Sequence, residues 1–253
     1  MAVARIAWVV AVVAAVVAGA LATGCGGKRE ADPAPAPAPA PKAHPHAVLR
    51  PEFTVDGDPL AAGTAFLIKE GAATLLVTAH HLFGPAGGLD HELTWDELPR
   101  RVTAVRATSL DDPGVTIRGG SPLALTGAVG LSEQHLGGDV AVFPIPDAGP
   151  ARTLELADGP PRVGSSVTLL ARVIGKTGTR HGAKVVEVGE EHIAYELDEP
   201  GELRATSGAP VVDADERVVA INVSGGEIDG KRINFGVSIS AFGPAIRKAL
   251  AAR

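Results

Sequence analysis

Ser207 has the surroundings best suited to nucleophilic chemistry in this chain of 253 residues. It lies in a loop of small residues, 205–209, that continues through Pro210 into an apolar strand. Gly208 and Ala209 are expected to leave room beside the hydroxyl for a substrate backbone, and Pro210 to stiffen the end of the turn. A serine hydroxyl is a weak nucleophile at neutral pH. Chemistry at Ser207 therefore needs a histidine to take its proton and a carboxylate to orient that histidine.

Two adjacent histidines and one aspartate occur upstream in suitable places. His80 and His81 directly follow an apolar run, 74–79, and Asp139 follows two glycines and precedes another. Successive residues of a strand or its tight exit point to opposite sides, so only one of the two histidines can face the serine. Asp139 would sit at the mouth of a strand, where its carboxylate can accept a hydrogen bond from an imidazole. The alternative is an ordinary turn aspartate, which is common after Gly-Gly.

Short apolar runs bounded by turn residues predict an all-β domain that would hold these side chains. The first half, about 48–148, contains a hairpin and three further strands, and the second half, about 149–240, contains six strands. The expected strands are 63–68, 74–79, 101–106, 115–118, 140–143, 166–171, 184–188, 192–197, 211–212, 217–223 and 233–239. The Ala-, Arg- and Lys-rich end, 241–253, predicts a closing helix in which Pro244 is the opening residue.

Three short segments resemble, in chain order, the signatures of trypsin-like serine endopeptidases of the chymotrypsin fold. Thr78-Ala79-His80-His81 is similar to T-A-x-H, Asp139-Val140-Ala141 to D-[IV]-A, and Ala205-Thr206-Ser207-Gly208-Ala209-Pro210 to G-x-S-G-x-P. The resemblance covers roughly residue 48 to the end. It implies two antiparallel six-stranded β-barrels with a C-terminal helix, in a disulfide-free bacterial form because the chain has a single cysteine.

The resemblance also implies a role for each residue. Ser207 would be the nucleophile, His81 the general base and acid, and Asp139 its orienter, with His80 a packed or exposed neighbour. Backbone N–H groups of Ala205 and Ser207 would form the oxyanion hole. Ala205 departs from the family, which has a glycine at positive φ there, and an L-residue would be strained by roughly 1–2 kcal/mol. Either the loop accepts this strain, or one peptide is flipped and the hole is unformed.

The N-terminus resembles a bacterial lipoprotein signal. One arginine precedes an apolar run, 6–23, and the segment Leu21-Ala22-Thr23-Gly24-Cys25 resembles a lipobox, although Ala22 stands where Leu, Val or Ile is preferred. Residues 1–24 would be removed, and Cys25, the sole cysteine, would become the lipidated first residue. The alternative is an uncleaved membrane helix, since the run is close to the roughly 20 residues that span a bilayer.

The segment 25–47 is rich in alternating proline and alanine, which favours an extended, semi-rigid spacer. His44 and His46 are interpreted as solvated parts of this linker. A net charge of −6 and a pI near 5.7 argue against nucleic acid as a partner. Because no zinc or nucleotide motif occurs, we expect no metal and no cofactor.

These features predict an exported, monomeric serine endopeptidase. It would be lipid-anchored in a bacterial cell envelope, facing the periplasm or the surface, and would take protein or peptide substrates. The alternative is a catalytically idle protease-fold lipoprotein that binds peptides or partners, which the departure at Ala205 motivates. Thr206 replaces an aspartate that in trypsin pairs with a freed N-terminus, so activation by N-terminal trimming is not implied. Gly201, at the approximate base of the specificity pocket, is uncharged, whereas Glu199 and Glu202 lie nearby.

Overall fold

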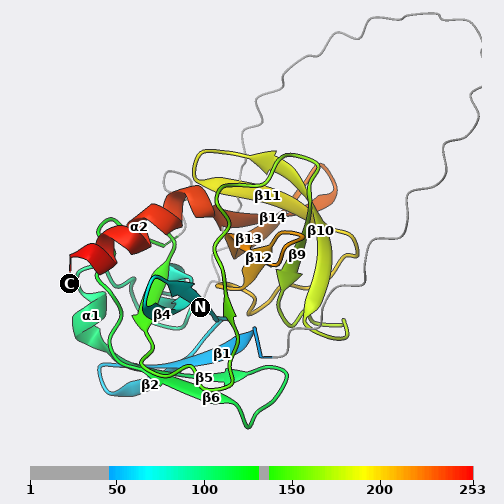
Figure 1. Ribbon diagram of the computed structural model, residues 1–253. Helices are drawn as coiled ribbons and strands as arrows, with labels where there is room; N and C mark the ends of the chain where they lie inside the picture. Colours follow the sequence, from blue (N-terminus) through cyan, green and yellow to red (C-terminus); the bar gives the residue numbers. More distant parts are fainter. Residues whose placement is uncertain (1–45, 131–136, 253) are drawn as a thin grey trace, which may run out of the picture. The chain divides into compact units, whose positions relative to one another are not determined.

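The computed structural model describes residues 46–130 and 137–252. The expected signal peptide, Cys25 and most of the linker lie outside them. The first half of the described chain forms two four-stranded sheets (Figure 1). One sheet has the order β2 (Asp58–Ala61), β1 (Leu49–Val55), β5 (Val102–Ser109) and β6 (Thr116–Gly119). The other has the order β7 (Ala141–Pro144), β4 (Ala73–Thr78), β3 (Phe66–Glu70) and β8 (Thr153–Leu154), in which only β3 and β8 are parallel.

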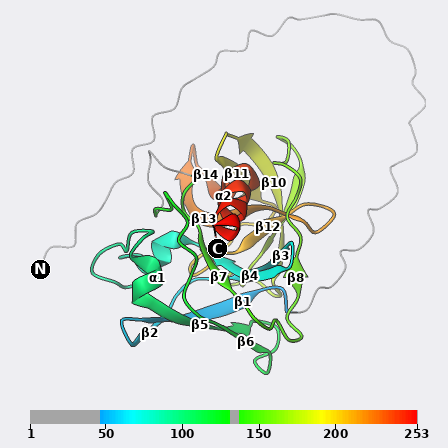
Figure 2. The ribbon, with the colours of Figure 1, turned by 60° about the vertical axis from the view of Figure 1, so that its left-hand side comes forward.

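The second half is a closed six-stranded antiparallel barrel, seen beside the first half in both ribbon views (Figures 1 and 2). Its order is β10 (Arg180–Val188), β11 (His192–Leu197), β14 (Lys231–Ser238), β13 (Val218–Ile228), β12 (Pro210–Val212) and β9 (Ser166–Leu170). A 3-10 turn, η1 (His80–Phe83), follows β4, and α1 (Leu98–Arg101) precedes β5. The helix α2 (Ile239–Ala251) follows β14.

The prediction of an all-β fold with a closed barrel and a C-terminal helix is confirmed. The second six-stranded barrel that was expected is not seen in the described residues, where the strands of the first half form the two four-stranded sheets described above. The pattern missed β1, because Pro51 interrupts a run that otherwise alternates. β2 pairs with β1 only from Glu52 onward, so Pro51 lies where that side of the strand has no ladder partner.

The C-terminal helix begins earlier than expected. Its N-cap is Ser238, whose hydroxyl accepts the N–H of Ser240, so Pro244 lies inside the helix instead of opening it. No helix in the described residues is long and apolar enough to cross a membrane.

Among the described residues, three buried clusters hold the domain together. Phe53, Phe83 and Phe143 pack between the two sheets of the first half, with ring centroids 4.6–6.0 Å apart. A second cluster around Tyr195 fills the barrel. The third joins β3 and β4 to the barrel strands and to α2, which contributes Phe242. Burying this shared apolar surface fixes the two halves against each other and brings the exits of β4 and of the loop before β12 together.

Candidate active site

His81 and Asp139 form a tight pair. The Asp139 carboxylate is fully buried and accepts two hydrogen bonds, one from the His81 backbone N–H at 2.8 Å and one from Nδ1 at 2.6 Å. An ionised carboxylate can only accept, so the proton of the imidazole must lie on Nδ1 and the Nε2 atom of a neutral ring carries a free lone pair. The His81 side chain keeps 15% of its surface exposed. The pair therefore presents an oriented base to solvent.

His80 points elsewhere. Its side chain is fully buried, and its Nε2 lies 2.8 Å from the carbonyl of Leu93, to which it donates. The His80 Nδ1 atom has no hydrogen-bond partner in the described chain. His80 is therefore a packed residue, which is one of the two alternatives expected for it.

Ser207 and His81 line the same cavity, of about 300 Å³, together with Gly63, Leu82 and Ala205. The Ser207 Oγ is not hydrogen-bonded to His81 in this structure; it donates to the carbonyl of Val223 at 3.4 Å. An O–H···O contact of this length is weak compared with the usual 2.7–2.8 Å or so. The hydroxyl can consequently leave Val223 at small cost.

The loop that carries Ser207 is held by its carbonyl groups. Thr64, in the loop before β3, donates its hydroxyl to the Ala205 carbonyl at 2.8 Å and its N–H to the Ser207 carbonyl at 2.8 Å. The Thr64 carbonyl in turn accepts from the Thr78 hydroxyl at 2.7 Å. The first half of the domain thereby fixes the serine loop of the second half.

Ala205 occupies the left-handed region, with φ of 61°. The N–H of Thr206 donates to the Leu203 carbonyl at 3.2 Å, so residues 203–206 form a β-turn with a positive φ at its third residue, the type II pattern. A type I turn, in which the middle peptide faces the other way, needs negative φ there. Of the two alternatives for Ala205, the structure adopts the strained one.

Two backbone N–H groups of this loop stay available. Neither Ala205 nor Ser207 donates its N–H to any group within residues 46–130 and 137–252. Ala205 is exposed, and both residues border the cavity that His81 lines. The loop therefore offers two donors where an anionic oxygen could bind.

A buried chain of neutral hydrogen bonds supports the same turn from behind. The Tyr195 hydroxyl donates to Asn222 Oδ1 at 2.6 Å, and Asn222 Nδ2 donates to the Thr206 hydroxyl at 3.0 Å and the Thr206 carbonyl at 3.2 Å. The Thr206 hydroxyl then donates to the Leu203 carbonyl at 2.7 Å. Burial raises the pKa of the Tyr195 phenol, which keeps it a neutral donor. Polar side chains thus order the turn within the domain.

Gly208 has a different purpose from the one expected of it. Its φ is 88°, and an added Cβ would lie 2.2 Å from the Thr64 carbonyl oxygen and 2.4 Å from the Thr78 hydroxyl. The glycine therefore allows the serine loop to pack on the loop before β3; it does not keep space open for a substrate.

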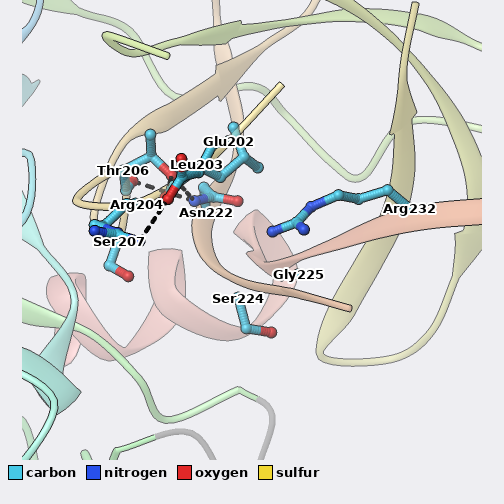
Figure 3. Close-up of a pocket in the computed structure, with 9 residues that line it drawn as sticks. All are labelled: Glu202, Leu203, Arg204, Thr206, Ser207, Asn222, Ser224, Gly225 and Arg232. Carbon is cyan, nitrogen blue, oxygen red and sulfur yellow. Dashed lines mark hydrogen bonds and ion pairs between the residues drawn. The ribbon is translucent and has the colours of Figure 1, made fainter. Parts of the chain in front are cut away.

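A second cavity, of about 280 Å³, also includes Ser207 (Figure 3). Gly201, expected at the base of a specificity pocket, does not line it, and Glu199 is bound to Lys176 by an ion pair of 2.6 Å. The charged residues that do line it are Glu202, Arg204 and Arg232. No sequence pattern pointed to Arg232, because the pairing of β13 with β14 brings this residue to the cavity.

The structure also corrects the interpretation of His46 as a solvated linker residue. Its N–H donates to Asp111 at 3.2 Å, and its Nδ1 lies 3.2 Å from the Ser109 hydroxyl. Ala47 and Val48, which follow it, are buried. Within the described chain, no group of three or more His, Cys, Asp or Glu side chains is arranged to hold a metal ion.

The fold is trypsin-like, and the chain belongs to the family with the trypsin-like peptidase domain, whose profile matches residues 63–221. Among solved structures, it is similar to the active form of the Rv3671c protease from M. tuberculosis, at 18% identity and a TM-score of 0.52, with 81% of each chain covered. It is also similar to the scabies mite inactivated protease paralogue S-I1, at 12% identity and a TM-score of 0.56, covering 82% of this chain and 96% of that one. These identities indicate a shared fold. No curated protein matches the sequence.

Proposed function

We propose that this protein is a serine endopeptidase that hydrolyses peptide bonds through an acyl-enzyme on Ser207. The observation that carries the proposal is the His81–Asp139 pair, in which a buried carboxylate orients an imidazole beside the cavity that Ser207 lines. A buried acceptor that takes up both N–H groups of one histidine has little structural purpose except to fix that ring.

In the proposed mechanism, the Ser207 hydroxyl leaves the Val223 carbonyl and transfers its proton to His81 Nε2 as its oxygen attacks the substrate carbonyl. Asp139 stabilises the imidazolium that results. The protonated Nε2 next donates to the leaving amine, which departs and leaves an ester on Ser207. A water molecule, deprotonated by the same nitrogen, then hydrolyses this ester and restores the serine.

The negative charge that develops on the carbonyl oxygen would be stabilised by the N–H groups of Ala205 and Ser207. This assignment is supported by the positive φ of Ala205 and by the lack of other acceptors for the two groups among the described residues. Removing one such donor in a comparable site costs on the order of 100- to 1,000-fold in kcat. The strain of roughly 1–2 kcal/mol at Ala205 is smaller than this catalytic benefit.

The test is labelling by a fluorophosphonate probe together with hydrolysis of a fluorogenic peptide library. We expect the wild type to be labelled, and Ser207→Ala and His81→Ala to lose both labelling and hydrolysis. His80→Ala, which removes a packed side chain, serves as the matched control and should keep both, provided that folding is verified by circular dichroism. Absence of labelling in a folded wild type would favour the idle peptide-binding lipoprotein. Loss in His80→Ala alone would reverse the assignment of the base.

We further propose that Cys25 anchors the protein to a bacterial membrane as a lipidated residue, with the domain facing the periplasm or the outside of the cell. The support is in the sequence: one cysteine in the whole chain, placed after an apolar run and small residues. Cys25→Ser should leave an unprocessed precursor that no longer incorporates labelled palmitate. If the variant is still processed and lipid-labelled, the anchor lies elsewhere.

A further inference from the structure

The second cavity, which is drawn in Figure 3 and includes both Ser207 and Arg232, contains one cation without a counter-ion. Arg232 extends from β14, and Figure 3 shows its guanidinium directed toward Asn222, Ser224 and Gly225. In the part of the chain that the structure describes, this side chain makes no hydrogen bond and no ion pair. Its cross-strand neighbour on β13 is Glu227, and the two do not pair.

The other charges around the cavity neutralise each other. Glu202 and Arg204 form an ion pair of 2.8 Å with both side chains largely exposed. Asn222 and Thr206, the buried polar residues of the lining, use their side-chain groups in the hydrogen-bond chain to Tyr195 and Leu203. The cavity therefore presents a net positive charge and few other free polar groups, among which is the hydroxyl of Ser224.

One stretch of the cavity wall has no side chain, and the cavity includes both Ser207 and Arg232. Gly225 lines the cavity, and an added Cβ there would lie 2.7 Å from Oδ1 of the buried Asn234. A Cβ at this position would be forced against Asn234, so this stretch of the wall requires glycine. Because Ser207 borders the same cavity, a side chain that enters it belongs to a residue next to the bond that Ser207 would attack.

We propose that Arg232 gives this site a preference for peptides with aspartate or glutamate immediately before the scissile bond. A guanidinium presents two parallel N–H groups that match the two oxygens of a carboxylate. Lysine or arginine in the same place would meet an unpaired like charge. This inference rests on the proposed peptidase activity and names the class of substrate for it.

The experiment compares four fluorogenic peptides that differ only in the residue before the scissile bond, which is Glu, Gln, Lys or Leu. For the wild type we expect kcat/KM for Glu to exceed that for Gln by about 10- to 100-fold, the range for hydrogen bonds to a charged group. Arg232→Gln should abolish this ratio, and Arg232→Glu should favour Lys. The matched control is Lys231→Gln, which removes a neighbouring cation that lies 3.6 Å from Glu196 and outside the cavity. It should keep the preference.

Binding to the folded Ser207→Ala variant separates this inference from the proposed function. Fluorescence anisotropy would compare C-terminally amidated peptides that end in Glu or Gln. Preferential binding of Glu, lost in the Ser207→Ala/Arg232→Gln variant, would uphold the role of Arg232 even if the wild type hydrolyses nothing, in which case the proposed function fails. Hydrolysis or binding without preference for Glu, or a preference that survives Arg232→Gln, would overturn the inference.

Discussion

Replacing Ala205 by glycine tests whether the serine loop holds its conformation in solution. An L-residue in the left-handed region costs roughly 1–2 kcal/mol, which glycine avoids. Glycine also increases the entropy of the unfolded chain, which lowers stability by about 0.4–1 kcal/mol. With φ at 61°, Ala205→Gly should therefore change the free energy of unfolding by between about zero and +1.6 kcal/mol.

Ala72 provides the matched control. It is exposed in the turn between β3 and β4, and its φ is not positive. Ala72→Gly introduces the same flexibility without relieving strain, so it should lower the free energy of unfolding by about 0.4–1 kcal/mol. The two variants should differ by about 1–2 kcal/mol in urea denaturation with unchanged m-values.

Hydrolysis of a peptide ester by Ala205→Gly should equal that of the wild type, because the N–H of residue 205 is held in the same place in both. Two results would refute this reasoning. A loss of stability equal to that of Ala72→Gly would mean that Ala205 is not left-handed in solution. A rate at least tenfold higher would mean that the resting loop has its middle peptide turned away, and that glycine lets it turn back.

Three further predictions concern the support of the site. Tyr195→Phe should lose about 1–3 kcal/mol of stability, because Asn222 Oδ1 is left buried without a donor. A double-mutant cycle with Asn222→Leu, measured by urea denaturation, should show strong coupling, and additive losses would contradict the hydrogen-bond chain. Gly208→Ala should destabilise by roughly 2–5 kcal/mol, since its Cβ meets the Thr64 carbonyl at positive φ, and a near-normal Tm would disprove that close packing. Burial lowers the pKa of His181 below its ordinary 6.5, so the unfolded chain binds a proton more readily than the folded chain and stability falls as the pH drops below 6.5. Between pH 7.5 and 5.5 the Tm of His181→Gln should therefore change less than the Tm of the wild type.

The amino-acid sequence alone determined the class of fold and the chemistry to look for. Strand periodicity and turn residues are local properties, so most strands of both halves could be predicted from it. The exceptions were β1, in which Pro51 disguised a strand, and the short strands β2 and β8. The sequence also placed His81, Asp139 and Ser207 next to strand ends, because short motifs carry their own backbone context.

Only the tertiary structure decided how these residues meet. His81 and Asp139 are 58 positions apart and Thr64 and Ala205 are 141 apart, so their hydrogen bonds depend on sheet register and on packing between the two halves. The left-handed turn at Ala205 is fixed by such contacts against the preference of the residue itself. Arg232 reaches the cavity beside Ser207 because β14 pairs with β13 in a closed barrel. Long-range register of this kind leaves no local pattern in the sequence, since each strand could pair in several ways before the barrel closes.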